Sequence, residues 1–241
     1  MGKKTRRKRK PQLPRELVVM KNSDKGCHES YKEGQNPIRF PHPFRCCLLG
    51  KVNSGKSMIV KNLLMAHQGA DPKFQQVIVV HGDPETKEYD DIEPTCIRNT
   101  LPEVKELDPD VKKLLIIDDV DFSGMSKREK ALISDLFRHG STHRNTSIIL
   151  SHQSFFSVPK VCRDQSNTFI LWKPHDLDTC GTIGRRVGLK KAEITSLFRE
   201  YLPNWRDSLL INMIPGAPYK FGKNLYEALP DPRNVPQLDD I

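Results

Sequence analysis

Eight consecutive residues of the chain have the types and spacing of a phosphate-binding loop. They follow the pattern GxxxxGK[ST], between a short apolar segment and a helical pattern. Glycines let the backbone curl so that successive N–H groups point at phosphate oxygens, and the helix N-terminus adds a partial positive charge. The motif therefore predicts that the chain binds ATP with Mg²⁺. The residues expected to hold the nucleotide are Gly50, Lys51, Val52, Asn53, Ser54, Gly55, Lys56 and Ser57.

Two residues of this loop have predicted chemical roles of their own. We expect the Lys56 ammonium group to reach the β- and γ-phosphates, where it would act in catalysis. The Ser57 hydroxyl is expected to ligate Mg²⁺.

A second candidate lies where an apolar run ends in two carboxylates, Leu114-Leu-Ile-Ile-Asp118-Asp119. A buried strand of this kind would present Asp118 to the metal, directly or through a water molecule. Asp119 can then polarise the attacking water as a general base. Acidic pairs after strands also begin turns, but the presence of the phosphate-binding loop favours the catalytic interpretation.

A third candidate is Gln153, in the strand-like run Ser147-Ile-Ile-Leu-Ser-His-Gln153 that ends in polar residues. A polar residue at the end of such a strand can sense the γ-phosphate or hold the attacking water, and His152 is the alternate. Oligomeric ATPases also use an arginine from a neighbouring subunit to neutralise transition-state charge. Arg138, Arg144 and Arg163 flank this strand, and Arg144 is the preferred candidate for that catalytic role.

Apolar segments and helical patterns alternate along the chain. This alternation predicts an α/β fold of the P-loop NTPase type (RecA/ASCE-like), with a mostly parallel sheet and helices on both faces. Expected strands are 45–49, 76–81, 113–118, 146–151, 167–172 and 209–214. Expected helices are 57–67, 126–139 and 189–201, the second with a capping box formed by Ser126 and Glu129.

Composition divides the 241 residues into three parts. Residues 1–36 read as a basic, disordered arm, 37–215 as the ATPase domain and 216–241 as a Pro-rich tail. Seven positive charges at 3–10 leave only +2 of the net charge of +9 for the rest of the chain. Such an arm attracts polyphosphates or a nuclear import receptor.

Cysteine spacing and hydropathy exclude other classes of protein. The six cysteines form no CxxC pair, so a disulfide framework or zinc site is not expected. No run of about 18 apolar residues predicts a membrane span, and the start of the chain has no secretory signal. We expect an intracellular protein, in a host nucleus or cytoplasmic assembly site, with the virion as an alternative location.

These parts, in this order, resemble the FtsK–HerA superfamily, in particular the genome-packaging ATPases of large DNA viruses of the poxvirus type. Relatives of those ATPases occur in virophages and Polinton-like elements. The resemblance runs over residues 36–215 and rests on Phe44-Arg45, the phosphate-binding loop, the Ile-Ile-Asp-Asp run and residues 141–160. The stretch from Gln153 through 158–160 to Arg163, Asn167 and Phe169 is the most specific.

The resemblance implies a motor that uses ATP to package a double-stranded DNA genome into a viral capsid. It implies DNA binding without sequence specificity, a homo-oligomeric ring, usually a hexamer, and a capsid or portal protein as partner. It assigns metal and γ-phosphate roles to Lys56, Ser57, Asp118 and Gln153. Two positions depart from the family pattern: Asp119 stands where cellular members have Glu, and the order His143-Arg144 differs from that of viral relatives.

Two other functions stay open at this stage. A nucleotide-gated assembly factor would bind ATP without rapid turnover. A small-molecule or nucleoside kinase would need an Arg-rich lid, for which Arg185-Arg186 is the only candidate. A GTPase is disfavoured because no Asn-Lys-x-Asp motif occurs, and an ABC-type ATPase because the Leu-Ser-Gly-Gly-Gln-like signature is missing.

Overall fold

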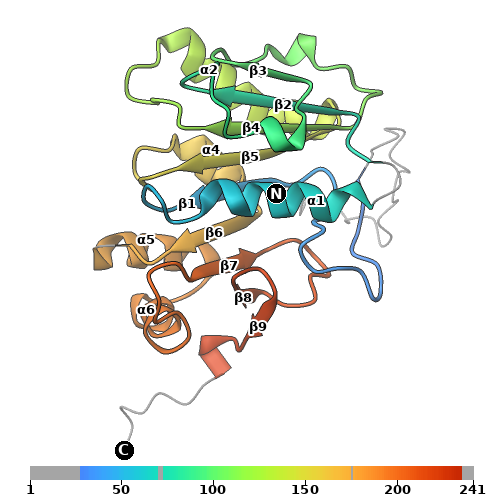
Figure 1. Cartoon of the computed structure of the whole chain (residues 1–241). Coiled ribbons are helices and arrows are strands. Elements are labelled where there is room, and N and C mark those ends of the chain that lie inside the picture. The colour runs from blue at the N-terminus through green and yellow to red at the C-terminus, as the bar shows by residue number, and fades with distance from the viewer. Residues whose placement is uncertain (1–27, 70–72, 175, 235–241) are drawn as a thin grey trace, which may run out of the picture.

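Apolar runs form the central strands of a mixed sheet. In a computed structural model that describes residues 28–69, 73–174 and 176–234, nine strands pair in the order β3-β2-β4-β5-β1-β6-β7-β8-β9 (Figure 1). The described strands are β1 (Arg45–Leu49), β2 (Gln76–His81), β3 (Cys96–Arg98), β4 (Lys113–Asp118), β5 (Thr146–His152), β6 (Thr168–Trp172), β7 (Ser208–Asn212), β8 (Phe221–Lys223) and β9 (Glu227–Leu229).

Helices connect these strands. They are α1 (Lys56–Gln68), α2 (Lys127–Asp135), α3 (Ser141–His143), α4 (Lys160–Gln165), α5 (Leu177–Val187) and α6 (Lys191–Glu200). Shorter helical turns are η1 (Asp90–Ile92), η2 (Val104–Glu106), η3 (Leu136–Gly140) and η4 (Pro232–Asn234).

The sheet is parallel from β3 to β6 and antiparallel from β6 to β9. Parallel strands must be covered on both faces, and successive side chains of a strand alternate between those faces. In β1, Cys47 and Leu49 belong to one hydrophobic cluster, with α2, α4, α5 and α6. Cys46 and Leu48 belong to the other, with α1 and Phe44. Helices on both faces therefore build two cores, as predicted.

The predicted strands at 45–49, 76–81 and 113–118 are confirmed to the residue. The helix predicted from Ser126 begins with the expected capping box, in which the Glu129 N–H donates to Ser126 Oγ over 3.3 Å. It does not stop at His139, because a π-helical turn (η3) carries the chain on into α3. Helix α5 was not predicted, since Gly181 and Gly184 interrupt its pattern.

The domain boundary predicted at residue 215 is wrong. The sheet continues through β8 and β9, which form an antiparallel hairpin against β7. The Phe221 side chain is buried in the core at that end of the sheet. The short strands were missed because they hold only three residues each. Of the predicted tail, residues 235–241 lie outside the described residues.

Residues 28–36, assigned to the arm, lie against the domain. The Glu29 carboxylate pairs with the Lys112 ammonium at 2.6 Å, and the Asn212 amide donates to the Tyr31 hydroxyl at 2.6 Å. These contacts place the start of the domain before residue 37. The basic run at 3–10 lies outside the described residues.

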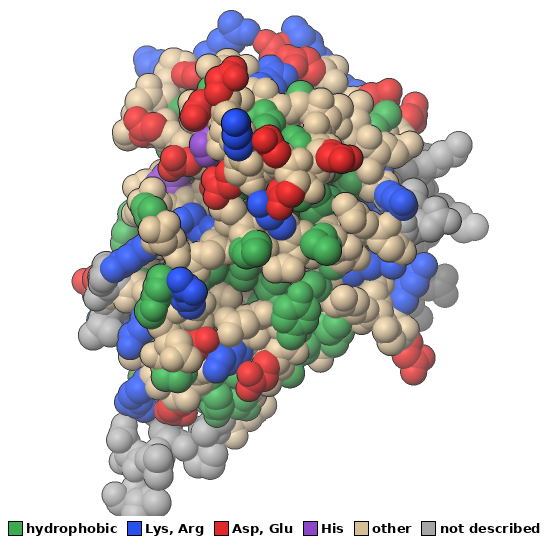
Figure 2. All heavy atoms as spheres, viewed as in Figure 1, with side chains coloured by type: hydrophobic (Ala, Val, Ile, Leu, Met, Phe, Trp, Pro, Cys, Tyr) green, Lys and Arg blue, Asp and Glu red, His purple; other side chains and the backbone are tan. Residues whose placement is uncertain are grey.

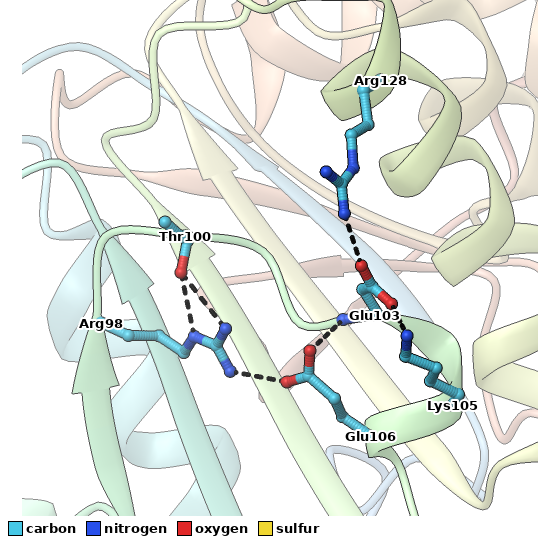
Figure 3. Close-up of polar contacts among 6 residues, drawn as sticks. All are labelled: Arg98, Thr100, Glu103, Lys105, Glu106 and Arg128. Carbon is cyan, nitrogen blue, oxygen red and sulfur yellow. Dashed lines mark hydrogen bonds and ion pairs between the residues drawn. The ribbon is translucent and has the colours of Figure 1, made fainter.

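Charged residues gather on the segment between β2 and β3. Figure 2 shows acidic side chains over the upper part of the viewed face, around η1, and exposed hydrophobic side chains below, over α1 and β7 to β9. Figure 3 shows two ion pairs around η2: Arg98 of β3 contacts Glu106 of η2 at 3.0 Å, and Arg128 of α2 contacts Glu103, just before η2, at 2.7 Å. Exposed pairs of this kind contribute little to stability, so burial holds the sheet together.

The end of α1 carries a histidine in an apolar setting. His67 is 1% exposed, and its ring stacks on Phe44 and packs at a tilt against Phe74, at centroid distances of 5.4 and 5.0 Å. Within the described part of the chain, neither ring nitrogen has a hydrogen-bond partner. Burial therefore lowers the pKa of His67 from 6.5 to about 3, so the folded protein holds this ring neutral.

This burial predicts acid sensitivity. As pH falls below 6.5 the unfolded chain binds a proton at His67 that the folded chain does not, so stability present above pH 6.5 is lost progressively toward pH 3. The His67→Phe variant should lose less stability than the wild-type chain between pH 6.5 and 4. The slope of its free energy of unfolding against pH should be smaller by up to about 1.4 kcal/mol per pH unit. Urea unfolding across that range measures it. An unchanged slope would contradict the assignment, and the exposed His139→Phe change is the control.

Candidate nucleotide-binding site

The predicted phosphate-binding loop joins the end of β1 to the start of α1. Gly55 precedes the helix with φ of 101°, a left-handed conformation that favours glycine. Gly50 lies against the Trp172 indole so closely that a Cβ atom there would be 2.6 Å from the ring. Gly55 is thus required by its backbone conformation, and Gly50 by the lack of room for a side chain beside Trp172 and Ser54.

The loop is held together by hydrogen bonds to its own carbonyls. The Lys56 ammonium donates to the Gly50 and Lys51 carbonyl oxygens, each at 2.8 Å. The buried Ser54 hydroxyl also donates to the Lys51 oxygen, at 2.8 Å. Burial lowers the pKa of Lys56, while Asp118, Asp119 and Glu88 act in the opposite direction. Lys56 therefore lies inside the loop with carboxylates across the cavity from it.

Strand register explains why distant residues meet at this loop. In parallel pairing, Leu49 of β1 lies beside His152 of β5, Asp118 of β4 beside Ser151, and His81 of β2 beside Asp118. The carboxyl ends of four strands thus lie at one edge of the sheet, which is where α/β proteins bind ligands.

A cavity of about 770 Å³ opens at this edge. It brings together the predicted residues Asp118, Asp119 and Gln153 with most of the loop. Gly50, Lys51 and Ser54 line two smaller neighbouring cavities instead. The predicted residues around the main cavity are Val52, Asn53, Gly55, Lys56, Ser57, Asp118, Asp119 and Gln153, and the others are Met58, His81, Glu88, Trp205 and Arg206.

Two neighbouring residues that the sequence did not single out engage the predicted metal ligands. The buried Tyr89 hydroxyl donates to Asp118 Oδ2 at 2.6 Å, and the Ser57 hydroxyl donates to Glu88 Oε1. Burial, followed by the charge of Asp118, raises the pKa of Tyr89, which therefore remains a proton donor to the carboxylate. The segment after β2 thus contributes to the site through contacts that no local motif encodes.

The donor atoms around Asp118 suit a divalent cation. Ligand atoms of His81, Glu88 and Asp118 lie within 4.8 Å of one another, beside the Ser57 hydroxyl. Carboxylate and hydroxyl oxygens are the ligands that Mg²⁺ prefers. The residues present therefore fit the metal that the motif predicts. His81 could have been expected here, because it ends a strand at the same edge of the sheet.

Asp119 and Gln153 both reach the cavity as exposed side chains. Asp119 has φ of 50°, a strained conformation for a non-glycine residue that turns the chain sharply after β4. The alternate sensor, His152, does not line the cavity: its Nδ1 accepts from the Ser154 N–H at 3.1 Å, and its ring packs against Phe122 at a tilt of 40°. The geometry therefore favours Gln153 over His152.

The candidate arginines lie away from this cavity. Arg144 follows α3 at the amino end of β5, whereas the phosphate-binding loop of the same chain lies at the carboxyl end. The length of the strand therefore separates the two by roughly 20 Å. Arg138 is an exposed residue of η3 in the same region. Arg163 stacks on the Phe155 ring at 4.6 Å. None of the three lines the cavity of its own chain, and an arginine acting on a neighbouring subunit stays a prediction.

Comparison with known proteins gives solved structures of similar fold. The genome packaging NTPase B204 from Sulfolobus turreted icosahedral virus 2, in complex with ATP-gammaS, matches with a TM-score of 0.53 at 14% identity, over 81% of this chain and 100% of that one. B204, the DNA-packaging ATPase from Sulfolobus turreted icosahedral virus, matches with a TM-score of 0.52 at 14% identity, over 78% and 99%.

No protein-family model and no curated protein matches the chain. At such low identity the structural similarity establishes the fold, which is α/β of the P-loop NTPase type. In the described residues no helix has the length and apolar character needed to cross a bilayer.

The contact between Tyr89 and Asp118 can be tested through stability. Tyr89→Phe removes the buried donor to the carboxylate, so the free energy of unfolding should fall by about 1.5–3 kcal/mol, the range for hydrogen bonds to charged groups. Chemical denaturation measures this loss. Tyr226→Phe, at a side chain 60% exposed, is the matched control and should change little. Equal effects of the two changes would show that Tyr89 does not support Asp118.

Proposed function

We propose that this chain is an ATP-hydrolysing motor that moves double-stranded DNA, in the manner of a viral genome-packaging ATPase. One observation carries the proposal: most of a phosphate-binding loop, the two carboxylates at the end of β4 and Gln153 surround a single cavity. This set supplies each part that nucleotide hydrolysis needs, namely phosphate binding, metal ligation and activation of water. Solved structures of this fold include NTPases named for genome packaging.

In the proposed reaction the residues of the loop bind and orient the triphosphate. Lys56 would exchange its contacts with the loop carbonyls for the β- and γ-phosphates and offset their charge. Ser57 and Asp118 would hold Mg²⁺, which supplies charge neutralisation when bound. Asp119 would accept a proton from the attacking water, and Gln153 would orient that water by its amide. Arg144 is proposed to act on a neighbouring subunit of a homo-oligomeric ring.

Handling of DNA is supported by charge. Seven of the first ten residues are Lys or Arg, and such an arm binds phosphates through release of counterions. Double-stranded DNA, a capsid or portal protein and further copies of this chain are the proposed partners, with a hexamer as the proposed ring. Action at a viral assembly site in the host nucleus or cytoplasm belongs to the same proposal.

One alternative draws on a specific observation. Lys56 is bonded to the loop and Ser57 to Glu88, so the nucleotide must break contacts within the chain to bind. That arrangement also suits a nucleotide-gated assembly factor with slow turnover. A kinase is less well supported, because Arg186 of the candidate lid is ion-paired with Asp164.

Hydrolysis with and without DNA separates these functions. We expect long double-stranded DNA to raise the rate of steady-state ATP hydrolysis at low salt. Lys56→Ala should abolish this hydrolysis both with and without DNA. Asp119→Asn should lower kcat by roughly 100-fold or more, as loss of a general base does. Lys130→Ala, at an exposed lysine of α2 that does not line the cavity, is the control. Turnover that DNA leaves unchanged would contradict the motor, and absent turnover with intact binding would favour the gated factor.

Glu88 can be tested separately from Asp119. Glu88→Gln keeps an acceptor for the Ser57 hydroxyl but removes one negative charge beside the proposed metal ligands. The Mg²⁺ concentration for half-maximal hydrolysis should therefore rise roughly 3- to 10-fold, with kcat at saturating Mg²⁺ nearly unchanged. Glu85→Gln, an exposed change in the same segment, is the control. A collapse of kcat would instead make Glu88 the base.

A further inference from the structure

Trp205 is a large hydrophobic side chain left exposed beside the phosphate-binding loop. It is 63% exposed, and Val52 of the loop is 61% exposed. Both line the 770 Å³ cavity and also a second cavity of about 470 Å³ that adjoins it. Exposed apolar side chains that converge on a cavity mark a surface on which a ligand is buried.

The loop that carries Trp205 is held in place before any ligand arrives. Trp172 Nε1 donates to the Arg206 carbonyl at 3.0 Å. The Asn204 N–H donates to Asp207 Oδ2 at 3.1 Å, and the Asp207 N–H donates back to the Asn204 oxygen at 3.0 Å. Because the same Trp172 ring packs on Gly50, one side chain sets the position of Trp205 relative to the phosphate-binding loop.

The two cavities differ in chemistry. The 770 Å³ cavity contains the carboxylates of Asp118, Asp119 and Glu88, so it offers the end suited to a metal and the γ-phosphate. The 470 Å³ cavity has no acidic residue in its lining, which combines the apolar Trp172, Pro174 and Pro203 with the cations Lys51 and Lys173. A nucleotide has the same division, since one end is anionic and the other is a flat aromatic base.

We propose that the Trp205 indole is the stacking platform for the purine base of a nucleoside triphosphate. The Arg206 guanidinium covers one face of the indole at 4.7 Å, which leaves the second face to the base. Arg206 also lines the phosphate end of the site, so this cation–π pair links the two halves of the ligand. The inference rests on the proposed function, because it names how that site holds its nucleotide.

Binding to the full chain tests the platform without any turnover. ATP-gammaS and inorganic tripolyphosphate, each with Mg²⁺, are titrated by calorimetry. Loss of a base–aromatic stack lowers affinity roughly 5- to 100-fold, so the affinity of Trp205→Ala for ATP-gammaS should fall by that factor. Trp205→Phe keeps an aromatic ring, so its affinity for ATP-gammaS should fall less. Tripolyphosphate affinity should not change. Tyr226→Ala, at another exposed aromatic residue, is the matched control.

Fluorescence gives a second readout, because the chain has two tryptophans and Trp172 is buried. ATP-gammaS should quench the wild-type signal, and Trp205→Phe should remove most of that response. Unchanged ATP-gammaS affinity in Trp205→Ala, or an equal loss for tripolyphosphate, would overturn the platform alone. Failure of the wild-type chain to bind either ligand would overturn the proposed function and the platform with it.

Discussion

Parallel pairing of β2, β4, β5 and β1 is the constraint on which the site depends. Because these strands run in one direction, the polar residues that end them meet at one edge, although they are far apart in sequence. Hydrophobic burial on both faces fixes the register, since a slip of one residue would move every side chain to the opposite face. His81 and Asp118 thus lie side by side because the apolar residues before them are packed.

Much of this arrangement could be predicted from local sequence. The phosphate-binding loop with its strand is recognised from one short stretch of sequence, and the Asp118–Asp119 pair with its strand from another. Contacts between distant segments could not be predicted in that way: Tyr89 and Asp118 are 29 residues apart, and Trp172 meets Gly50 only because the distant segment β6 pairs with β1. The β8–β9 hairpin was missed for a related reason, because three-residue strands gain their stability from β7 rather than from their own pattern.

The groups of the site are already paired within the chain. Lys56 is bonded to loop carbonyls, Ser57 to Glu88 and Asp118 to Tyr89. Such contacts satisfy polar groups that would otherwise be costly to bury, and they hold the loop in shape. They also set a threshold for binding, because a ligand must offer better partners to Lys56 and Ser57 than the chain itself does. A triphosphate with its metal offers both at once.

The charges of the cavity make that threshold selective. The lining of the cavity carries three carboxylates, Asp118, Asp119 and Glu88. It carries two cations, Lys56 and Arg206, so negative charge is in excess. A bare triphosphate would add its own negative charges to this excess, and like charges gathered in one cavity repel one another. A divalent cation between the phosphates and the carboxylates reverses the sign of that interaction. Under the proposed function, the carboxylates that would act in hydrolysis would therefore also make nucleotide binding depend on the metal, so an uncomplexed nucleotide would be disfavoured by the same residues that act on the complexed one.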